Sequence, residues 1–416
     1  MEPRIPGHPL PLIVAEIGTS HGGDLSKAEE LVAAAKESGA QVAKFQYIIA
    51  DEILHPRTGS VSLPGGNTDL YKSFKNLEKP IDFYARLMEL CEQYQIGFLC
   101  SPFGTRSLQH LVSLGVPALK IASPELNHLP LLREAAATGL PTILSTGVSR
   151  LRDIADALEV FAVSPRAYSP GNRLPKKGEG IDTLAKDDES AHPAPDDANI
   201  GKIEKPFVNP FNPALNHRVS LLHCITSYPA PEAEYNLRVL RTLHGIFGIP
   251  LGVSDHSLDP VLVPLLATAL GAHLIEKHLT LDKTSSGLDD PIALVPQQFA
   301  HMASLIASYK DDPFAIIPDL EEEYGSERVQ QILGSGVKEL AKSESDNYGR
   351  TNRSIHALHS LPAGSRLGVE DVAVLRTEKS LSPGIHPRFM DIVLGKRLTM
   401  DLEDGEGLTW NHLLQE

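Results

Sequence analysis

Cysteine is scarce in this sequence, and long apolar runs are missing. The three cysteines, Cys91, Cys100 and Cys224, show no CxxC spacing and are too few for a disulfide framework. We interpret Cys224 as a core residue. No segment approaches 18 consecutive apolar residues, and the proline-rich start, 1–12, holds no apolar stretch of signal-peptide length. We therefore expect a cytoplasmic protein that does not span a membrane.

Basic residues are outnumbered by acidic ones. The chain has 38 Lys and Arg against 53 Asp and Glu, which gives a formal net charge of −15 and a sequence pI near 5.6. Because a protein that neutralises nucleic-acid phosphates needs a positive surface, we expect no nucleic-acid partner. At 416 residues, the chain exceeds a single core of roughly 250 to 300 residues, so two domains are expected.

Short apolar runs rich in β-branched residues alternate with longer amphipathic stretches, a pattern typical of repeated βα units. The predicted strands are 12–18, 41–47, 96–102, 118–123, 142–147, 220–225, 250–256 and 274–281. Eight such units favour a closed (β/α)8 TIM barrel over a doubly wound sheet, which usually has about five to seven strands. Between the first two strands, Ser26 and Glu29 predict a helix-capping box, and Gly39 predicts the end of that helix.

The rest of the chain divides around this barrel. Residues 163–217 are rich in proline and poor in aromatics, and they predict a flexible insertion at the amino-terminal face that is dispensable for catalysis. We expect the barrel to span 1–310, with its last helix near 296–308. A helical linker, 311–350, and a small domain with little helix, 351–416, would follow.

Polar residues end seven of the eight predicted strands, at the rim where TIM barrels carry their functional groups. They are Glu16, Lys44 and Gln46, Ser101, Lys120 and Ser123, Ser145, Ser254 and His256, and Glu276 and His278. Residues two apart on a strand, such as Lys44 and Gln46, project to the same face. Because a lysine in an apolar strand needs an anionic partner, Lys44 and Lys120 with the serines predict a phosphate or carboxylate site.

Two histidines end neighbouring strands. His256 and His278 would stand roughly 4.8 Å apart, close enough for both imidazoles to bind one ion. Two nitrogen ligands leave positions open for water and substrate, which suits Mn²⁺, Mg²⁺ or Zn²⁺ as a Lewis acid. A single histidine or lysine at a strand end is often structural, but polar residues at seven strand ends sharing one rim favour an active site.

Seven strings of the sequence, in order, resemble the sialic acid synthase family, which condenses phosphoenolpyruvate with N-acetylmannosamine or a related amino sugar. They are IVAEIGTSHGGDL, VAKFQ, LKIASPELNHLPLL, TILSTG, LLHCITSYPAPEAEYNLRVL, GVSDHSLDP and GAHLIEKHLTLDK. The tail strings RSIHAL, PAGSRLGVEDVAVLR, SPGIHP and LGKRL look like the antifreeze-like (SAF) domain of that family.

The resemblance implies a role for each matching residue. His256 and His278 would bind a divalent metal, with Mn²⁺ expected and Mg²⁺ or Co²⁺ as alternatives. Phosphoenolpyruvate would be held by Lys44, Gln46, Ser101, Lys120, Ser123, Ser145 and Ser254. The sugar would meet Asn67, Tyr228, Asp289 and Arg376, and Glu16 or Glu276 would transfer a proton. The family also implies a domain-swapped homodimer, in which Arg376 reaches the partner's site and meets the N-acyl group of the acceptor.

Several strings depart from the family's usual pattern. SHGG at 20–23 replaces NHxG, GLDD at 287–290 replaces a GPDH-like string, PFG at 102–104 replaces PFD, NRS at 352–354 replaces RRS, and Arg376-Thr377 replaces Arg-Pro. Because the departures near Asp289 and Arg376 lie on the acceptor side, the product could be a sialic, legionaminic or pseudaminic acid. Two other classes stay open, a metal-dependent sugar-phosphate aldolase or hydrolase and a non-catalytic sugar-binding barrel.

Overall fold

The structure, a computed structural model, describes residues 10–63, 66–163, 218–285, 287–378 and 380–414, and of residues 61–63 and 66–68 only the backbone. All but the first residue of the predicted insertion, 163–217, lies outside the described residues. Among the helices described, none is both long enough and apolar enough to cross a membrane.

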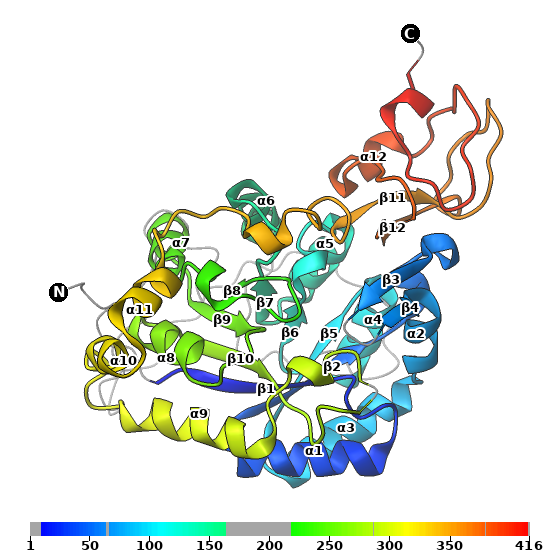
Figure 1. The fold of residues 1–416 in the computed structure, drawn as a ribbon. Coiled ribbons are helices and arrows are strands. Elements are labelled where there is room, and N and C mark those ends of the chain that lie inside the picture. The colour runs from blue at the N-terminus through cyan, green and yellow to red at the C-terminus, as the bar shows by residue number, and fades with distance from the viewer. Residues whose placement is uncertain (1–9, 64–65, 164–217, 286, 379, 415–416) are drawn as a thin grey trace, which may run out of the picture.

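Eight parallel strands form the centre of the molecule (Figure 1). They are β1 (Leu12–Gly18), β2 (Val42–Tyr47), β5 (Gly97–Pro102), β6 (Leu119–Ile121), β7 (Thr142–Ser145), β8 (Val219–Cys224), β9 (Leu251–Asp255) and β10 (Leu274–His278). Their order is β5-β2-β1-β10-β9-β8-β7-β6, and β5 lies beside β6, so the sheet closes on itself. The predicted TIM barrel is confirmed.

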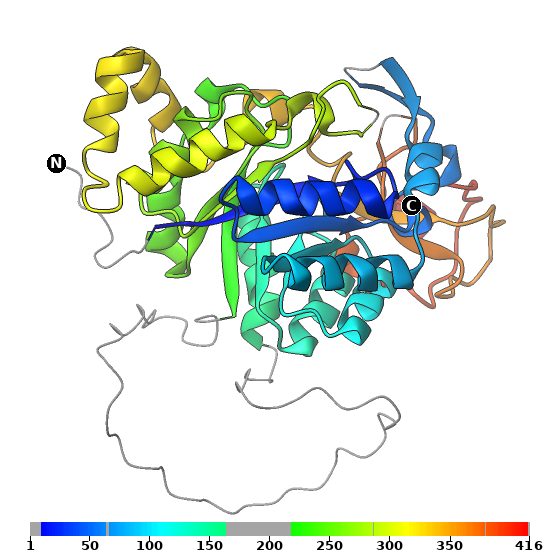
Figure 2. The ribbon, with the colours of Figure 1, turned by 90° about the horizontal axis from the view of Figure 1, so that it is seen from below.

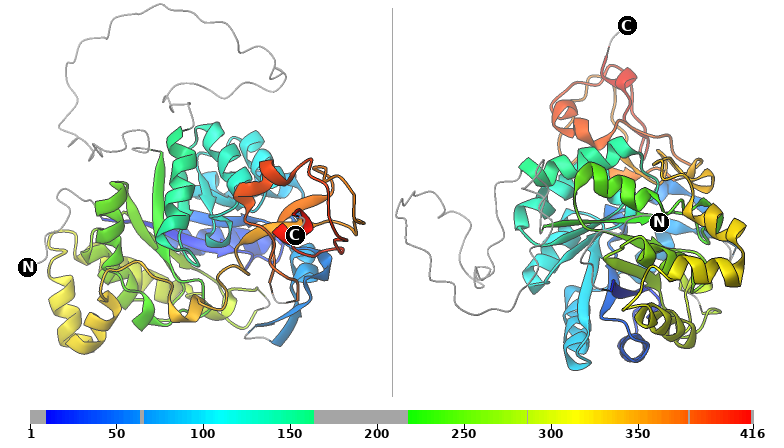
Figure 3. Two further views of the ribbon diagram at one scale, coloured as in Figure 1. Left: turned by 90° about the horizontal axis from the view of Figure 1, so that it is seen from above. Right: turned by 90° about the vertical axis from the view of Figure 1, so that its left-hand side faces the viewer.

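A helix follows each strand and covers the outside of the barrel (Figures 2 and 3). These helices are α1 (Leu25–Glu37), α3 (Ile81–Gln93), α4 (Thr105–Leu114), α5 (Leu129–Thr138), α6 (Leu151–Val163), α7 (Val239–Phe247), α8 (Leu262–Ala269) and α9 (Pro296–Ser308). Outward-facing strand residues such as Ala43 and Phe45 are fully buried in the core that the helices share. Inside the barrel, Val14, Leu99 and Leu222 form a smaller apolar cluster with Leu274, which closes one end.

The start of α1 differs from its prediction. Asp24, not Ser26, is the N-cap, and its carboxylate accepts hydrogen bonds from the backbone N–H groups of Ser26 and Lys27. An aspartate in extended conformation just before a helix satisfies the free N–H groups of the first turn, so the helix begins at Leu25, two residues earlier than a Ser26 cap would place it. Gly39, with φ +90°, follows the last turn as predicted.

A hairpin and a short helix that were not predicted follow the carboxyl end of β2. The antiparallel pair β3 (Ser60–Leu63) and β4 (Gly66–Asp69) leads into α2 (Leu70–Leu77). Asn67 lies on β4, opposite Ser62 in register. The insertion lies at the rim where the strands end, which is the functional face of this fold.

The segment after α9 is more than a linker. It forms α10 (Ile316–Tyr324) and α11 (Ser326–Leu333), and their apolar residues Ile316, Leu320, Val329 and Ile332 belong to the barrel's core. Residues 334–352, named the joining segment below, then lead to the C-terminal domain. The two helices therefore extend the barrel domain.

The C-terminal domain is small and has little helix. It contains the antiparallel pair β11 (Arg353–Ala357) and β12 (Val372–Arg376) and the short helix α12 (Met390–Val393) around a separate apolar core. It lies beside α5 and the loop after β2, where β12 pairs with Leu54 (Figure 1). The domain thus packs against the carboxyl-end rim of its own barrel.

Candidate active site

One pocket at the carboxyl ends of the strands collects twelve of the fifteen residues predicted for the site. They are Glu16, Lys44, Gln46, Ser101, Lys120, Ser123, Ser145, Tyr228, Ser254, His256, Glu276 and His278. Both members of every predicted pair of residues two apart line this pocket, namely Lys44 with Gln46, Ser254 with His256, and Glu276 with His278. Strand parity and the closed barrel explain this convergence, because alternate residues of every strand point to the interior.

Two lysines and two glutamates form a buried ion-pair network at the floor of this pocket. Lys44 Nζ lies 2.6 Å from Glu16 Oε2 and 3.5 Å from Glu276 Oε1. Lys120 Nζ lies 3.1 Å from the same Glu276 oxygen, to which the Ser254 hydroxyl donates at 2.9 Å. Gln46 Nε2 donates to Glu16 Oε1 at 2.8 Å. Each lysine is thus neutralised by carboxylates that a bound anion could partly replace.

The surroundings move the pKa values of these groups in opposite directions. Burial lowers the pKa of Lys120 below that of an ordinary lysine, although Glu276 opposes the change. For Lys44, burial is outweighed by the charges of Glu16 and Glu276, which raise its pKa. Burial would raise the pKa of Glu276, but the two lysines lower it to about 2. Glu276 is therefore ionised at neutral pH and committed to its three partners.

Two serine hydroxyls in the pocket lack partners. Within the described residues, the buried Oγ atoms of Ser101 and Ser145 neither donate nor accept a hydrogen bond. Glu276 Oε2 likewise accepts none from these residues. Buried polar atoms are normally satisfied, so unpaired hydroxyls beside two lysines indicate a place for an anionic ligand. Ser123 differs, since its Oγ accepts from the Gly147 N–H at 3.0 Å.

The two predicted metal ligands face each other across the pocket. The ring centres of His256 and His278 are 5.4 Å apart. His256 Nδ1 lies 2.7 Å from the Ile225 carbonyl, a contact that requires the proton on Nδ1 and turns the Nε2 lone pair toward the pocket. Among the residues that the structure describes, no three or more His, Cys, Asp or Glu side chains form a metal cluster. Any ion here would take two protein nitrogens and fill its other positions with substrate or water.

The histidines differ in charge preference. Burial, the charge of His256 and that of Lys44 hold the pKa of His278 well below its usual range, so this ring is neutral. Burial would lower the pKa of His256 as well, but Cys224 and the Ile225 carbonyl raise it to about 9. A cation bound between the rings would therefore displace a proton from His256.

Two of the predicted sugar contacts, Tyr228 and Asp289, lie beside the two histidines. Tyr228 stacks on His256 with ring centres 4.3 Å apart, and its hydroxyl lies 3.3 Å from His256 Nε2. Asp289 Oδ2 lies 3.9 Å from His278 Nδ1. Burial and the charge of Glu16 raise the pKa of Asp289 to about 6. Asn67 has only its backbone described, so its predicted contact lies outside the described side chains.

Arg376 lies against its own barrel. Its Nη2 lies 2.7 Å from Glu125 Oε1, and its guanidinium carbon stands 5.5 Å from the ring centre of Phe103. Arg353 binds the same Glu125 oxygen at 2.9 Å. Phe103 lines the pocket, which brings Arg376 to the edge of the site. The predicted reach of Arg376 into a partner's site stays a prediction.

Five pocket residues were not predicted, namely Phe103, Ala122, Pro124, Cys224 and Thr226. Cys224, interpreted as a core residue, is buried and also lines the pocket, with its Sγ 3.7 Å from His256 Nδ1. Strand parity could have identified Cys224 as a pocket residue, because it lies two residues after Leu222, which faces the barrel interior. A search for polar residues at strand ends missed Phe103, Ala122, Pro124 and Cys224, and Thr226 lies beyond the end of the predicted strand 220–225.

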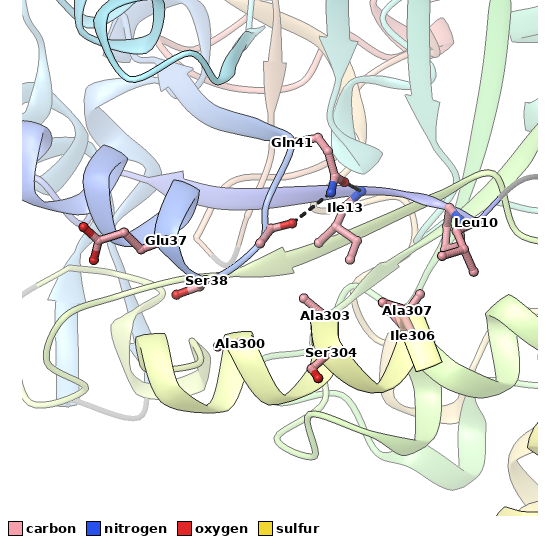
Figure 4. A pocket seen from close by; sticks show the side chains of 12 residues that line it. Leu10, Ile13, Glu37, Ser38, Gln41, Ala300, Ala303, Ser304, Ile306 and Ala307 are labelled. Atoms are coloured by element: carbon pink, nitrogen blue, oxygen red, sulfur yellow. Dashed lines mark hydrogen bonds between the residues drawn. The ribbon is translucent and has the colours of Figure 1, made fainter. Parts of the chain in front are cut away.

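A second pocket lies at the other end of the barrel, between α1, α9 and the start of β1 (Figure 4). Its lining is mostly small or apolar, with Ala300, Ala303 and Ala307 on α9. Gln41 there is occupied by hydrogen bonds with the Ile13 N–H and the Gly39 carbonyl. No predicted site residue lines this pocket. The chemistry-bearing side chains belong to the carboxyl-end pocket.

Comparisons with known proteins agree with this arrangement. The model of the NeuB family matches residues 31–311, and the model of the SAF domain matches 352–414. The N,N'-diacetyllegionaminic acid synthase of Legionella pneumophila is 32% identical over 405 residues, which cover 96% of this chain and 94% of that protein. The N-acetylneuraminate-9-phosphate synthase of Drosophila melanogaster is 26% identical, with 97% and 95% covered. The crystal structure of the spore coat polysaccharide biosynthesis protein SpsE of Bacillus subtilis matches with a TM-score of 0.72 and 27% identity, covering 98% of this chain and 96% of that one.

Proposed function

The chain belongs to the NeuB family, and from this premise we propose that it joins phosphoenolpyruvate to an N-acyl amino sugar, giving a nonulosonic acid and phosphate. The observation that carries the proposal is the single pocket in which two buried lysines, two unpaired serine hydroxyls and two facing histidines converge. The names of two relatives, a diacetyllegionaminic acid synthase and an N-acetylneuraminate-9-phosphate synthase, describe products of this class.

The lysine side of the pocket suits phosphoenolpyruvate, which carries a phosphate and a carboxylate. Lys44 and Lys120 supply charge, and the Ser101 and Ser145 hydroxyls supply donors that have no partner in the described part of the chain. Glu276 keeps the lysines in place before the substrate arrives. We therefore assign phosphoenolpyruvate to this side and the sugar to the side of Tyr228 and Asp289.

The histidine side suits a divalent cation, for which we propose Mn²⁺, with Mg²⁺ or Co²⁺ as alternatives. His256 and His278 would hold it, and when bound it would act as a Lewis acid on the aldehyde of the open-chain sugar. The Ile225 carbonyl fixes the His256 ring so that Nε2 faces the site, and burial keeps His278 neutral. His278 thus offers an unprotonated ring, whereas His256, whose pKa is raised to about 9, would lose a proton when the cation binds.

Between the two glutamates, Glu16 is the better proton-transfer group. In the reaction, C3 of phosphoenolpyruvate bonds to the aldehyde carbon, whose oxygen gains a proton. Water then adds at C2 and loses one proton, and the resulting hydroxyl loses its second proton as the bond between C2 and the phosphate oxygen breaks and the ketone forms. Glu276 is held by Lys44, Lys120 and Ser254 with its pKa lowered to about 2, which makes it a poor proton acceptor. Glu16 lies in register between His278 and Lys44, where the two substrates would meet.

For the acceptor we propose an N-acetylmannosamine-type sugar. The 32% identity to a diacetyllegionaminic acid synthase favours a 2,4-diacetamido-2,4,6-trideoxy hexose as the second candidate. A sugar-phosphate aldolase or hydrolase would have no use for phosphoenolpyruvate, and a non-catalytic barrel would not need buried lysines beside unpaired serines. The paired lysines and the family membership therefore favour the synthase.

Phosphate release tests the proposal directly. Phosphoenolpyruvate and Mn²⁺ are mixed with a panel of 2-acetamido and 2,4-diacetamido sugars, with and without a chelator. We expect release with one sugar, loss of release with the chelator, and loss in His256→Ala but not in His301→Ala, an exposed histidine on α9. Silence across the panel from folded, metal-loaded protein would refute the proposed reaction, and full activity of His256→Ala in metal-depleted buffer would refute the metal site.

A further inference from the structure

We propose that Glu344, in the joining segment, is a positioning residue that holds the two loops after β7 and β8, next to the active-site pocket. Glu344 ends the short 3-10 helix η6 (Lys342–Glu344) and is 1% exposed. It lies far in sequence from every strand of the barrel. The inference rests on the proposed function only for the identity of the substrates.

The Glu344 carboxylate binds two backbone N–H groups from different loops. Its Oε1 accepts from Val148 at 2.7 Å and from Thr226 at 2.6 Å. Val148 follows β7, and Thr226 follows β8. A carboxylate buried at this depth is stable only when charged donors or several N–H groups satisfy it. Here the two loop N–H groups bind Oε1, and the Ala341 N–H donates to Oε2 at 3.3 Å. One side chain therefore joins two loops that share no backbone ladder at these positions.

The loop after β7 is held from the joining segment at further points. Asn352 Nδ2 donates to the Val148 carbonyl at 3.0 Å, and Lys338 Nζ donates to the Thr146 carbonyl at 3.2 Å. Val148 has φ +42°, a left-handed conformation that β-branched residues rarely adopt. Such a conformation persists only where its surroundings fix it, and both backbone groups of Val148 are bound by the joining segment.

The conformation of these loops sets the pocket wall. Between Ser145 and Val148, Gly147 donates to the Ser123 hydroxyl at 3.0 Å. Gly147 also packs so closely that an added Cβ would stand 2.2 Å from Thr226 Oγ1 and 3.2 Å from Cys224 Sγ. Ser123, Ser145 and Thr226 all line the pocket. A shift of Val148 or Thr226 would therefore move groups on both the phosphoenolpyruvate side and the sugar side.

Amide hydrogen exchange of the whole protein tests the contact without any turnover. In Glu344→Ala, peptides covering 143–150 and 222–228 should exchange faster than in wild type by about tenfold or more, because two N–H groups lose their acceptor. Glu344→Gln keeps an acceptor oxygen and should retain most of the protection. Asp346→Ala, an exposed carboxylate two residues on, is the matched control and should exchange as wild type does. Unchanged exchange in Glu344→Ala would overturn the proposal.

Kinetics separate positioning from a general loss of folded protein. Displaced loops should raise KM for both substrates and lower kcat/KM by up to about 100-fold in Glu344→Ala, with recovery in Glu344→Gln. Partial unfolding would lower kcat alone and leave KM unchanged, which would count against positioning. If Glu344→Ala does not fold, Glu344→Asp replaces it in the test, because the shorter side chain keeps the charge but places the carboxylate farther from the two N–H groups. This variant should show the same increase in exchange and in KM to a smaller degree. A silent wild-type enzyme would refute the proposed reaction, whereas unchanged exchange refutes the role of Glu344.

Discussion

Among single residues, Lys120 holds a charge that burial disfavours. Its side chain is 2% exposed and has Glu276 as its ion-pair partner, while burial lowers its pKa. In Lys120→Met we expect kcat/KM for phosphoenolpyruvate to fall about 10- to 100-fold, the effect of removing a hydrogen bond to a charged ligand. Because its pKa is lowered, Lys120 should lose its proton at a lower pH than an ordinary lysine does. In the wild-type protein, KM for phosphoenolpyruvate should therefore begin to rise at a pH below the range in which lysines normally deprotonate.

The control for that prediction is Lys72→Met, because Lys72 is an exposed lysine on α2 that pairs with Asp69. Steady-state kinetics and circular dichroism of both variants are the measurements. Wild-type kinetics in a folded Lys120→Met protein would show that the anion binds elsewhere.

A second residue-scale prediction concerns stability rather than activity. His21 is 3% exposed and packs on Phe83, and burial lowers its pKa from the usual 6.5 to about 4. The folded chain thus keeps His21 neutral, whereas the unfolded chain protonates it below pH 6.5. The contribution of His21 to the free energy of unfolding is therefore complete above pH 6.5. It is lost as the pH falls from 6.5 toward 4, and the loss is about 3 kcal/mol at most.

The melting temperature of His21→Asn should therefore fall less between pH 7 and pH 4.5 than that of the wild-type protein. His301→Ala, which changes an exposed histidine, is the control and should keep the wild-type slope. An identical pH slope in His21→Asn and wild type would mean that His21 is protonated in the folded protein.

At the same scale, strand parity explains which site residues could be found from the sequence. Lys44 and Gln46, or Glu276 and His278, are fixed to one face by the backbone, and the closed barrel turns that face inward. Asp289 and Arg376 lie on a loop and in a separate domain, where no periodicity relates them to the barrel. Their neighbours, His278 and Glu125, became known only from the tertiary structure.

Among the elements, the cap of α1 offers a direct test, because sequence and structure disagree there. Asp24 accepts from the Ser26 N–H at 2.8 Å and from Lys27 at 3.4 Å. Asp24→Ala should destabilise the barrel by about 1 kcal/mol, the usual value of an N-cap. Ser26→Ala is the matched control and should change stability by less than about 0.5 kcal/mol. Thermal unfolding of both variants decides, and a larger loss in Ser26→Ala would restore the predicted capping box.

The eight strands were predictable because each is an apolar, β-branched run long enough to be buried on both faces. The hairpin β3–β4 was not, since its strands Ser60–Leu63 and Gly66–Asp69 have four residues each, and only Val61 and Leu63 among these eight are apolar. The helices α10 and α11 were expected as a linker because the segment that begins near residue 318 is charged. Their sparse apolar residues, such as Leu320 and Val329, nevertheless reach the barrel's core.

For the whole molecule, the position of the C-terminal domain bears on the predicted homodimer. The structure docks Arg353 and Arg376 on Glu125 of the same chain, whereas the family resemblance implies that Arg376 serves a partner. The two arrangements make opposite predictions for a mixture of Arg376→Ala and Lys120→Met chains. Recovery of activity on mixing would mean that each barrel takes its arginine from the partner. Continued inactivity of a mixed dimer would mean that each chain completes its own site.

Deletion of residues 170–212, within the predicted insertion, should leave the activity nearly unchanged. The residues that border it, Val163 at the end of α6 and Val219 at the start of β8, belong to the amino-terminal side of the barrel. The pocket lies at the carboxyl ends, on the other face. The residues left, 164–169 and 213–217, exceed the roughly two to six that usually connect a helix to a strand. We expect kcat/KM to stay within about twofold, since loop length changes stability only slowly. A folded deletion variant without activity would show that these residues reach the catalytic face.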